Sequence, residues 1–144
     1  MKKLLKLAMF VAALFSVAAA SAQSAEMTYY EPTENFEYQG KTYYSIKARF
    51  DLADCKGQDV NLYLHIESPK GTLINGEDGP ASASTKITVE ENGLQTSPIL
   101  QLVVPYKAFR KLKDKTLHAH LYLTINGKTV VSKYTTINPR PTKR

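Results

Sequence analysis

The sequence predicts an all-β protein: one antiparallel two-layer β-sandwich of immunoglobulin-like type with seven to eight strands, preceded by a signal peptide. Three observations lead to this prediction. Apolar and polar residues alternate with a period of two in several short segments. Turn sequences separate these segments at intervals of about 8–12 residues. No segment has a long helical pattern, and 144 residues, 43% of them hydrophobic, suffice for one domain.

The first 22 residues have the layout of a secretory signal peptide. Three lysines precede an uncharged apolar run at residues 7–15, and Ala20-Ser21-Ala22 forms a small-x-small cleavage site. An uncleaved membrane anchor is the alternative, but the run is shorter than the ~20 residues that a span needs. We therefore expect cleavage after Ala22, a secreted or periplasmic chain and no transmembrane segment after cleavage.

The mature chain is predicted to have three parts. Residues 23–35 are polar, contain Pro32 and are expected to form a flexible leader. Residues 36–137 are expected to form the sandwich domain. Residues 138–144 hold two prolines and three cations, which is typical of a flexible basic tail.

Alternation locates the strands of the predicted domain. Residues 46–52, 60–67 and 117–125 each place apolar side chains on one face and polar side chains on the other, as half-buried antiparallel strands do. Residues 99–104 are apolar on both faces, which favours a central strand.

Turn residues join these strands. Gln39-Gly40-Lys41 connects the first aromatic strand to the second. Asn126-Gly127 is the strongest signal and predicts a type I′ hairpin that leads into residues 128–137. Residues 106–113, which follow Pro105, are the one stretch where a short helix is expected.

A resemblance is carried by residues 43–52, Lys56-Gly57, residues 60–64, Val104-Pro105-Tyr106 and Phe109. These segments resemble a family of small secreted bacterial immunoglobulin-like β-sandwich domains of uncharacterised function. The resemblance covers roughly residues 43–125, and residues 71–95 depart from the family pattern. It implies a sandwich and export, and it carries over no catalytic residues.

The three histidines are the candidate metal ligands. His118 and His120 lie two residues apart on one strand and therefore point to the same face, and His65 occupies the polar phase of its own strand. If these strands are neighbours, three imidazoles meet in a way that suits zinc or copper. Otherwise they are separate histidines on a solvated face. No carboxylate or cysteine stands out as a fourth ligand, so no cofactor is predicted.

Local catalytic motifs are missing from the sequence. It contains no Gly-x-Ser-x-Gly, no phosphate loop and no His-Glu-x-x-His, and the spacing of Cys55 pairs it with no histidine. We therefore predict a protein that is not an enzyme. A triad assembled from distant residues stays open, because it leaves no local motif.

Aromatic and basic clusters are the candidate ligand-binding residues. Tyrosine combines a flat apolar face with a hydroxyl group, which suits glycans and protein interfaces, although tyrosine is also an ordinary strand residue. Residues 106–115 hold five cations and one acid, and they suit anionic partners unless they form only a solvated linker. The candidates are Tyr29, Tyr30, Tyr43, Tyr44, Lys107, Arg110, Lys111 and Lys113.

These observations predict a secreted or periplasmic non-enzymatic binding module. It would contact a protein or glycan partner of the cell envelope through a sheet face or loops, and no nucleic acid. The alternatives are a histidine-based metal-binding periplasmic protein and a subunit of a surface assembly, in which an open sheet edge accepts another chain. The oligomeric state is left open.

Overall fold

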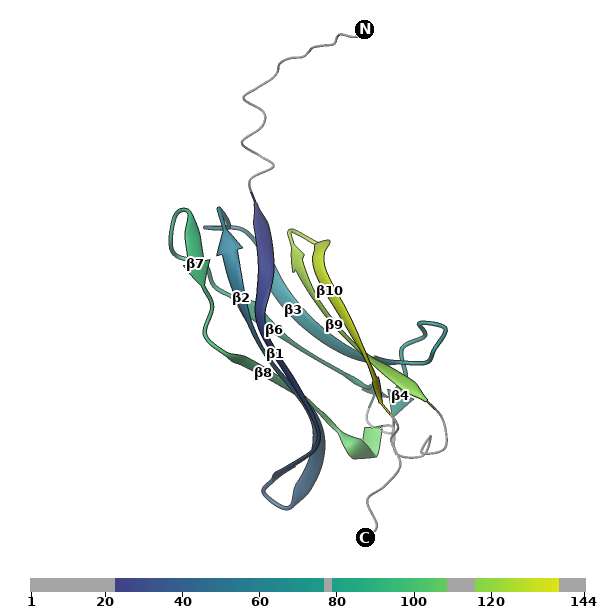
Figure 1. The fold of residues 1–144 in the computed structure, drawn as a ribbon. Helices are drawn as coiled ribbons and strands as arrows, with labels where there is room; N and C mark the ends of the chain where they lie inside the picture. The colour runs from purple at the N-terminus through teal and green to yellow at the C-terminus, as the bar shows by residue number, and fades with distance from the viewer. Residues whose placement is uncertain (1–22, 77–78, 109–115, 138–144) are drawn as a thin grey trace, which may run out of the picture.

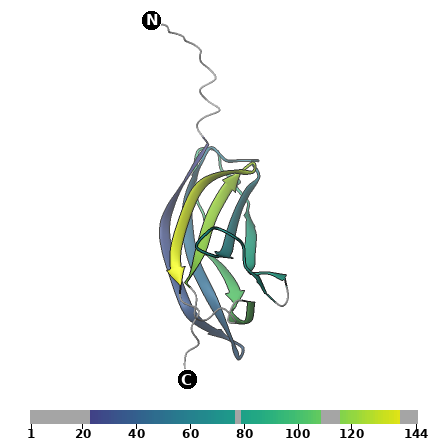
Figure 2. The same cartoon turned by 90° about the vertical axis from the view of Figure 1, so that its right-hand side faces the viewer.

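A computed structural model describes residues 23–76, 79–108 and 116–137. Two antiparallel sheets pack face to face (Figures 1 and 2). None of the helices in the described residues is long and apolar enough to cross a membrane. The elements are β1 (Ser24–Tyr38), β2 (Lys41–Ala53), β3 (Val60–Glu67), β4 (Asn75–Gly76), β5 (Gly79–Pro80), β6 (Ser82–Ile87), β7 (Leu94–Thr96), β8 (Leu100–Pro105), the 3-10 turn η3 (Tyr106–Ala108), β9 (Leu117–Ile125) and β10 (Lys128–Ile137).

The two main sheets have four strands each. In the first, β2 pairs with β1 along one edge and with both β8 and β7 along the other. The second has the order β10-β9-β3-β6. Strands β4 and β5 form a small separate ribbon. The antiparallel all-β sandwich expected from the alternation is therefore confirmed, and eight of the described strands have three or more residues.

Alternate side chains of β2, β3 and β9 fill the space between the sheets. Residues of one phase are almost completely buried, and those of the other phase lie on the outer faces. Burial of one large aliphatic side chain contributes about 1.5–3 kcal/mol, so this core is the main source of stability. The largest buried side chains are Tyr44, Phe50, Ile46, Leu52, Leu62, Leu64, Ile66, Leu117, Leu121, Leu123 and Val60.

The leader expected over residues 23–35 is wrong, because residues 24–35 belong to strand β1. Their pairing with β2 shifts register between Met27 and Tyr29 and again between Thr33 and Phe36. Each bulge interrupts the period of two, so the alternation that reveals a strand is absent from the sequence. Pro32 is tolerated since β1 is the outermost strand of its sheet and needs no second partner.

Strand β8 differs from its expected place. Residues 99–104 were predicted to be a central strand, but in the described residues β8 pairs with β2 alone. Leu102 and Val104 are buried in the core, and Val103 lies half-buried on the outer face. An apolar residue on the outer face of β8 therefore does not indicate a second strand partner. Val103 is apolar because it is half-buried on that face.

Both predicted hairpin turns are confirmed. Gln39 and Gly40 have φ angles of 49° and 78°, and Asn126 and Gly127 have 54° and 83°. Two successive positive φ angles define a type I′ turn, whose twist matches that of the strands it joins. The β1–β2 hairpin extends beyond the end of the second sheet (Figure 1). The expected helix is seen only as η3, because residues 109–115 lie outside the described residues.

Leu64→Ala should lower the free energy of unfolding by about 2–5 kcal/mol, because Leu64 is fully buried and the substitution leaves a cavity. Urea unfolding followed by circular dichroism measures the change. Leu94→Ala is the matched control, since Leu94 is 66% exposed and its truncation should change stability by less than about 0.5 kcal/mol. Equal losses in the two variants would contradict this description of the core.

Candidate functional site

The predicted tyrosine cluster is divided among three environments. Tyr44 is fully buried, so its prediction as a ligand-binding residue is wrong. It shares the inward phase of β2 with Ile46, and burial strongly raises the pKa of its hydroxyl. Tyr30 is half-buried at the edge where β1 meets β10, and its hydroxyl is hydrogen-bonded to Thr135 Oγ1. Tyr29 lies on the surface and donates a hydrogen bond of 2.6 Å to Glu31 Oε1.

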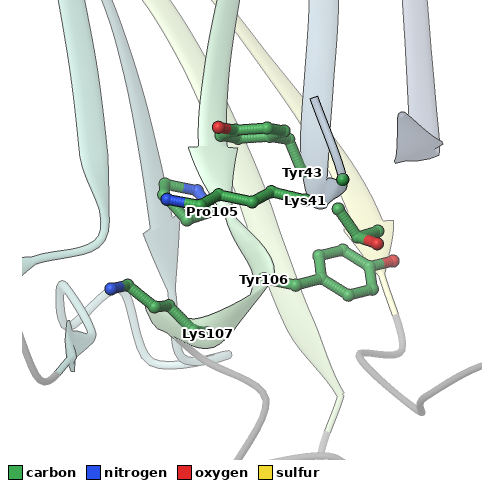
Figure 3. Close-up of a pocket in the computed structure, with 7 residues that line it drawn as sticks. Lys41, Tyr43, Pro105, Tyr106 and Lys107 are labelled. Carbon is green, nitrogen blue, oxygen red and sulfur yellow. The ribbon is translucent and has the colours of Figure 1, made fainter. Parts of the chain in front are cut away.

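Tyr43 is the member of the cluster that borders a groove. The groove lies at the end of the sandwich, where the β1–β2 hairpin meets the end of β8 and η3, and Figure 3 shows it in close-up. Its volume is about 540 Å³. We call it the hairpin groove, and it is lined by Gly40, Lys41, Thr42, Tyr43, Pro105, Tyr106 and Lys107.

The hairpin groove combines aromatic surface with cations. Lys41 comes from the start of β2 and Lys107 from η3, so two chain segments distant in sequence each contribute a cation to the groove. Burial raises the pKa of Tyr106 to about 12, with the nearby charge of Glu34 adding to the shift. The groove therefore presents two cations and a neutral phenol beside flat ring surfaces.

Aromatic surface continues on the other side of Tyr43. A second hollow of about 450 Å³ is lined by Tyr43, Phe36, Tyr38, Gln101 and Val103. Phe36 and Tyr43 are register partners in β1 and β2, so their side chains lie on the same outer face. Of the predicted basic candidates, Lys107 lines the groove, whereas Arg110, Lys111 and Lys113 lie outside the described residues.

The three histidines lie on the outer face of the second sheet. Strands β3 and β9 are neighbours, with His65 opposite His120 and Glu67 opposite His118. The adjacency that the metal alternative required is therefore present. However, no group of three or more His, Cys, Asp or Glu side chains within the described ranges is placed to hold a metal ion.

Hydrogen bonds occupy both ring nitrogens of His120. Its Nδ1 lies 3.0 Å from Glu67 Oε2 and its Nε2 lies 2.8 Å from Ser132 Oγ. His65 Nδ1 is 3.8 Å from the same carboxylate oxygen, and His65 Nε2 is 3.3 Å from the Tyr122 hydroxyl. A nitrogen engaged in this way offers no lone pair to a metal, so the arrangement is a hydrogen-bonded network.

Aromatic rings pack around this network. The His120 ring stacks on Tyr134 at a centroid distance of 4.1 Å and lies 4.7 Å from the ring of Tyr122. Tyr122 in turn stacks on Tyr63 at 4.9 Å. We call this surface the ring face, and it consists of Tyr63, His65, His118, His120, Tyr122 and Tyr134.

Comparisons with known proteins leave the function to be argued from these residues. No family model and no curated protein match the chain. A solved structure that resembles it is a bacterial adhesin from Mobiluncus mulieris containing intramolecular disulfide, isopeptide and ester bond cross-links. The TM-score is 0.41 and the identity 13%, over 83% of this chain and 54% of the adhesin chain. This chain thus spans about half of the adhesin chain.

Sequence reasoning missed several residues of these surfaces. Lys41 and Tyr106 are distant in sequence from each other, and only the fold brings them to one groove. Glu67 and Ser132 each belong to the polar phase of a strand, but their approach to His120 depends on strand order. The sequence did indicate which face of the sheet each residue occupies, because apolar and polar residues alternate along each strand.

His65→Gln should flatten the dependence of stability on pH. Burial lowers the pKa of His65 from its ordinary 6.5; Glu67 opposes the shift and His120 adds to it. The unfolded chain therefore binds this proton more readily than the folded protein does. The contribution of neutral His65 to the free energy of unfolding is fully present above pH 6.5, and it is lost as the pH falls through the pKa of His65 in the folded protein. Urea unfolding between about pH 7 and pH 5 measures the slope.

His118→Gln is the control for this prediction. His118 lies on the same outer face opposite Glu67, but within the described residues the hydrogen bond and ion pairs of Glu67 are made with His120 and His65. Its pH dependence should follow that of the unsubstituted protein. An unchanged slope in His65→Gln would show that His65 does not carry the effect.

Proposed function

We propose that the mature chain is a binding module of the cell envelope that takes an anionic glycan in the hairpin groove. The observation that carries this proposal is the groove itself, in which Tyr43 lies beside Lys41 and Lys107 belongs to the same lining (Figure 3). Tyrosine faces stack on sugar rings, and clustered lysines attract carboxylate or sulfate groups. A volume of about 540 Å³ is in the range of small-ligand sites.

The charge distribution along the chain supports an anionic ligand. Residues 23–105 hold six basic and twelve acidic side chains, whereas residues 106–144 hold ten basic and one acidic. The basic part begins at Tyr106, which lines the groove. Export, expected from residues 1–22, would bring this groove to envelope polysaccharides. Those residues lie outside the described residues, so export is part of the proposal.

Lys41→Ala should weaken binding of polygalacturonate about 3- to 10-fold, and Tyr43→Ala about 10-fold or more, since a lost ion pair or ring contact costs roughly 1–2 kcal/mol. Isothermal titration calorimetry of the mature chain measures both changes. Neutral dextran should bind about 10-fold more weakly than polygalacturonate or weaker still. Added salt should reduce this difference in affinity, because it screens the charges of the lysines.

Lys128→Ala is the control because it removes the same charge from the β9–β10 hairpin and leaves the groove intact. Its affinity should equal that of the unsubstituted chain. An equal loss in Lys128→Ala would indicate general charge attraction and contradict the groove. Binding of an acidic envelope protein with no binding of any acidic polysaccharide would also overturn the glycan proposal.

A further inference from the structure

Three polar side chains form one hydrogen-bonded line across the outer face of the second sheet. Ser132 on β10 lies 2.8 Å from Nε2 of His120 on β9, and Nδ1 of the same imidazole lies 3.0 Å from the carboxylate of Glu67 on β3. A hydroxyl, an imidazole and a carboxylate in this order are the groups of a serine hydrolase triad, which is recognised by geometry and roles on any fold. We propose that they form an acyl-transfer site that hydrolyses small activated esters.

The order of the three groups suits these roles. An ionised carboxylate only accepts hydrogen bonds, so Glu67 accepts from the Nδ1–H of His120. This leaves the lone pair on Nε2 to accept from the hydroxyl of Ser132. The nucleophile is exposed, whereas Glu67 is only 7% exposed, which strengthens its interaction with the imidazole.

Two rings hold the base in place. The His120 imidazole is nearly parallel to the ring of Tyr134, at an angle of 10°, and it is also in contact with Tyr122 at 33°. These contacts limit rotation of the imidazole about its side-chain bonds. A catalytic group on a central strand with such support keeps its geometry without reorganisation.

A groove of about 340 Å³ lies on the same outer face and shares Glu67 with the triad. It is lined by Glu67, His118, Tyr134 and the loop residues Pro69, Lys70 and Gly71. Neither Ser132 nor His120 lines this groove, so the groove does not select the acyl group. The substrate class is a small activated ester with a good leaving alcohol. We assign no pair of hydrogen-bond donors to the negative oxygen of the tetrahedral intermediate. The rate of ester hydrolysis is therefore expected to depend on the leaving group.

The reaction needs water as its only co-reactant. The Ser132 oxygen bonds to the carbonyl carbon of the ester while its proton passes to His120 Nε2. The tetrahedral intermediate collapses, and the C–O bond to the leaving group breaks as that oxygen takes the proton from His120. Water then attacks the acyl-serine with His120 as base, which releases a carboxylic acid and restores the serine. Glu67 is a positioning residue that orients the imidazole and stabilises its cation.

The test is covalent labelling of the mature chain with an alkyl fluorophosphonate, together with hydrolysis of p-nitrophenyl acetate. We expect one label per chain, mapped to Ser132 by mass spectrometry, and its loss in Ser132→Ala. His120→Asn should slow labelling about 100-fold or more, the usual contribution of a general base. Ser84→Ala is the matched control, since Ser84 pairs with Tyr63 and lies on the same outer face.

Glu67→Gln separates positioning from a structural effect. It should slow labelling and remove the low-field proton resonance of the His120 Nδ1–H, and Glu67→Asp should restore part of both. Circular dichroism confirms that each variant is folded. An unlabelled wild-type chain, or equal labelling in Ser132→Ala, overturns the triad. Neither result affects the glycan proposal, because the triad and the hairpin groove share no residue.

Discussion

The period of two along β2, β3 and β9 is the constraint on which the rest of the structure depends. One phase of each strand is hidden between the sheets, so the other phase must lie on an outer face. A shift of one residue in β3 would bury His65 and expose Leu64, and it would destroy the core and the ring face together. The outer surfaces are therefore determined by the same packing that stabilises the fold.

Closure of the sandwich depends on a different interaction. Strand β1 lies at the edge of one sheet and β10 at the edge of the other, and the two edges meet through the hydrogen bond between Tyr30 and Thr135. Lys133 also lies over the Tyr30 ring, 5.3 Å from its centroid. An aromatic residue on an edge strand thus serves the fold, whereas the sequence suggested a ligand-binding role for it.

The local sequence pattern predicted the strands in which apolar and polar residues alternate regularly. It failed for β1, which is a strand because of its pairing with β2 and not because of its own pattern. Strand β1 is held by its long register with β2, but two bulges break its period, so its sequence looks like a leader. The positions of Tyr43 and Tyr44 were available from the pattern, because Tyr44 is in phase with Ile46 and Phe50. Their different environments follow from phase alone, although both were taken as one aromatic cluster.

Strand order is what the sequence does not contain, and the ring face depends on it. Alternation places His65, His120 and Ser132 on polar faces, but only the order β10-β9-β3 puts His120 between its two partners. The same order surrounds that imidazole with tyrosine rings from its own strand and from β10. Central strands of a sheet are its most rigid part, whereas the hairpin groove is built at an overhanging end. The ring face is therefore suited to fixed geometry, and the groove is suited to a ligand that needs room to adjust.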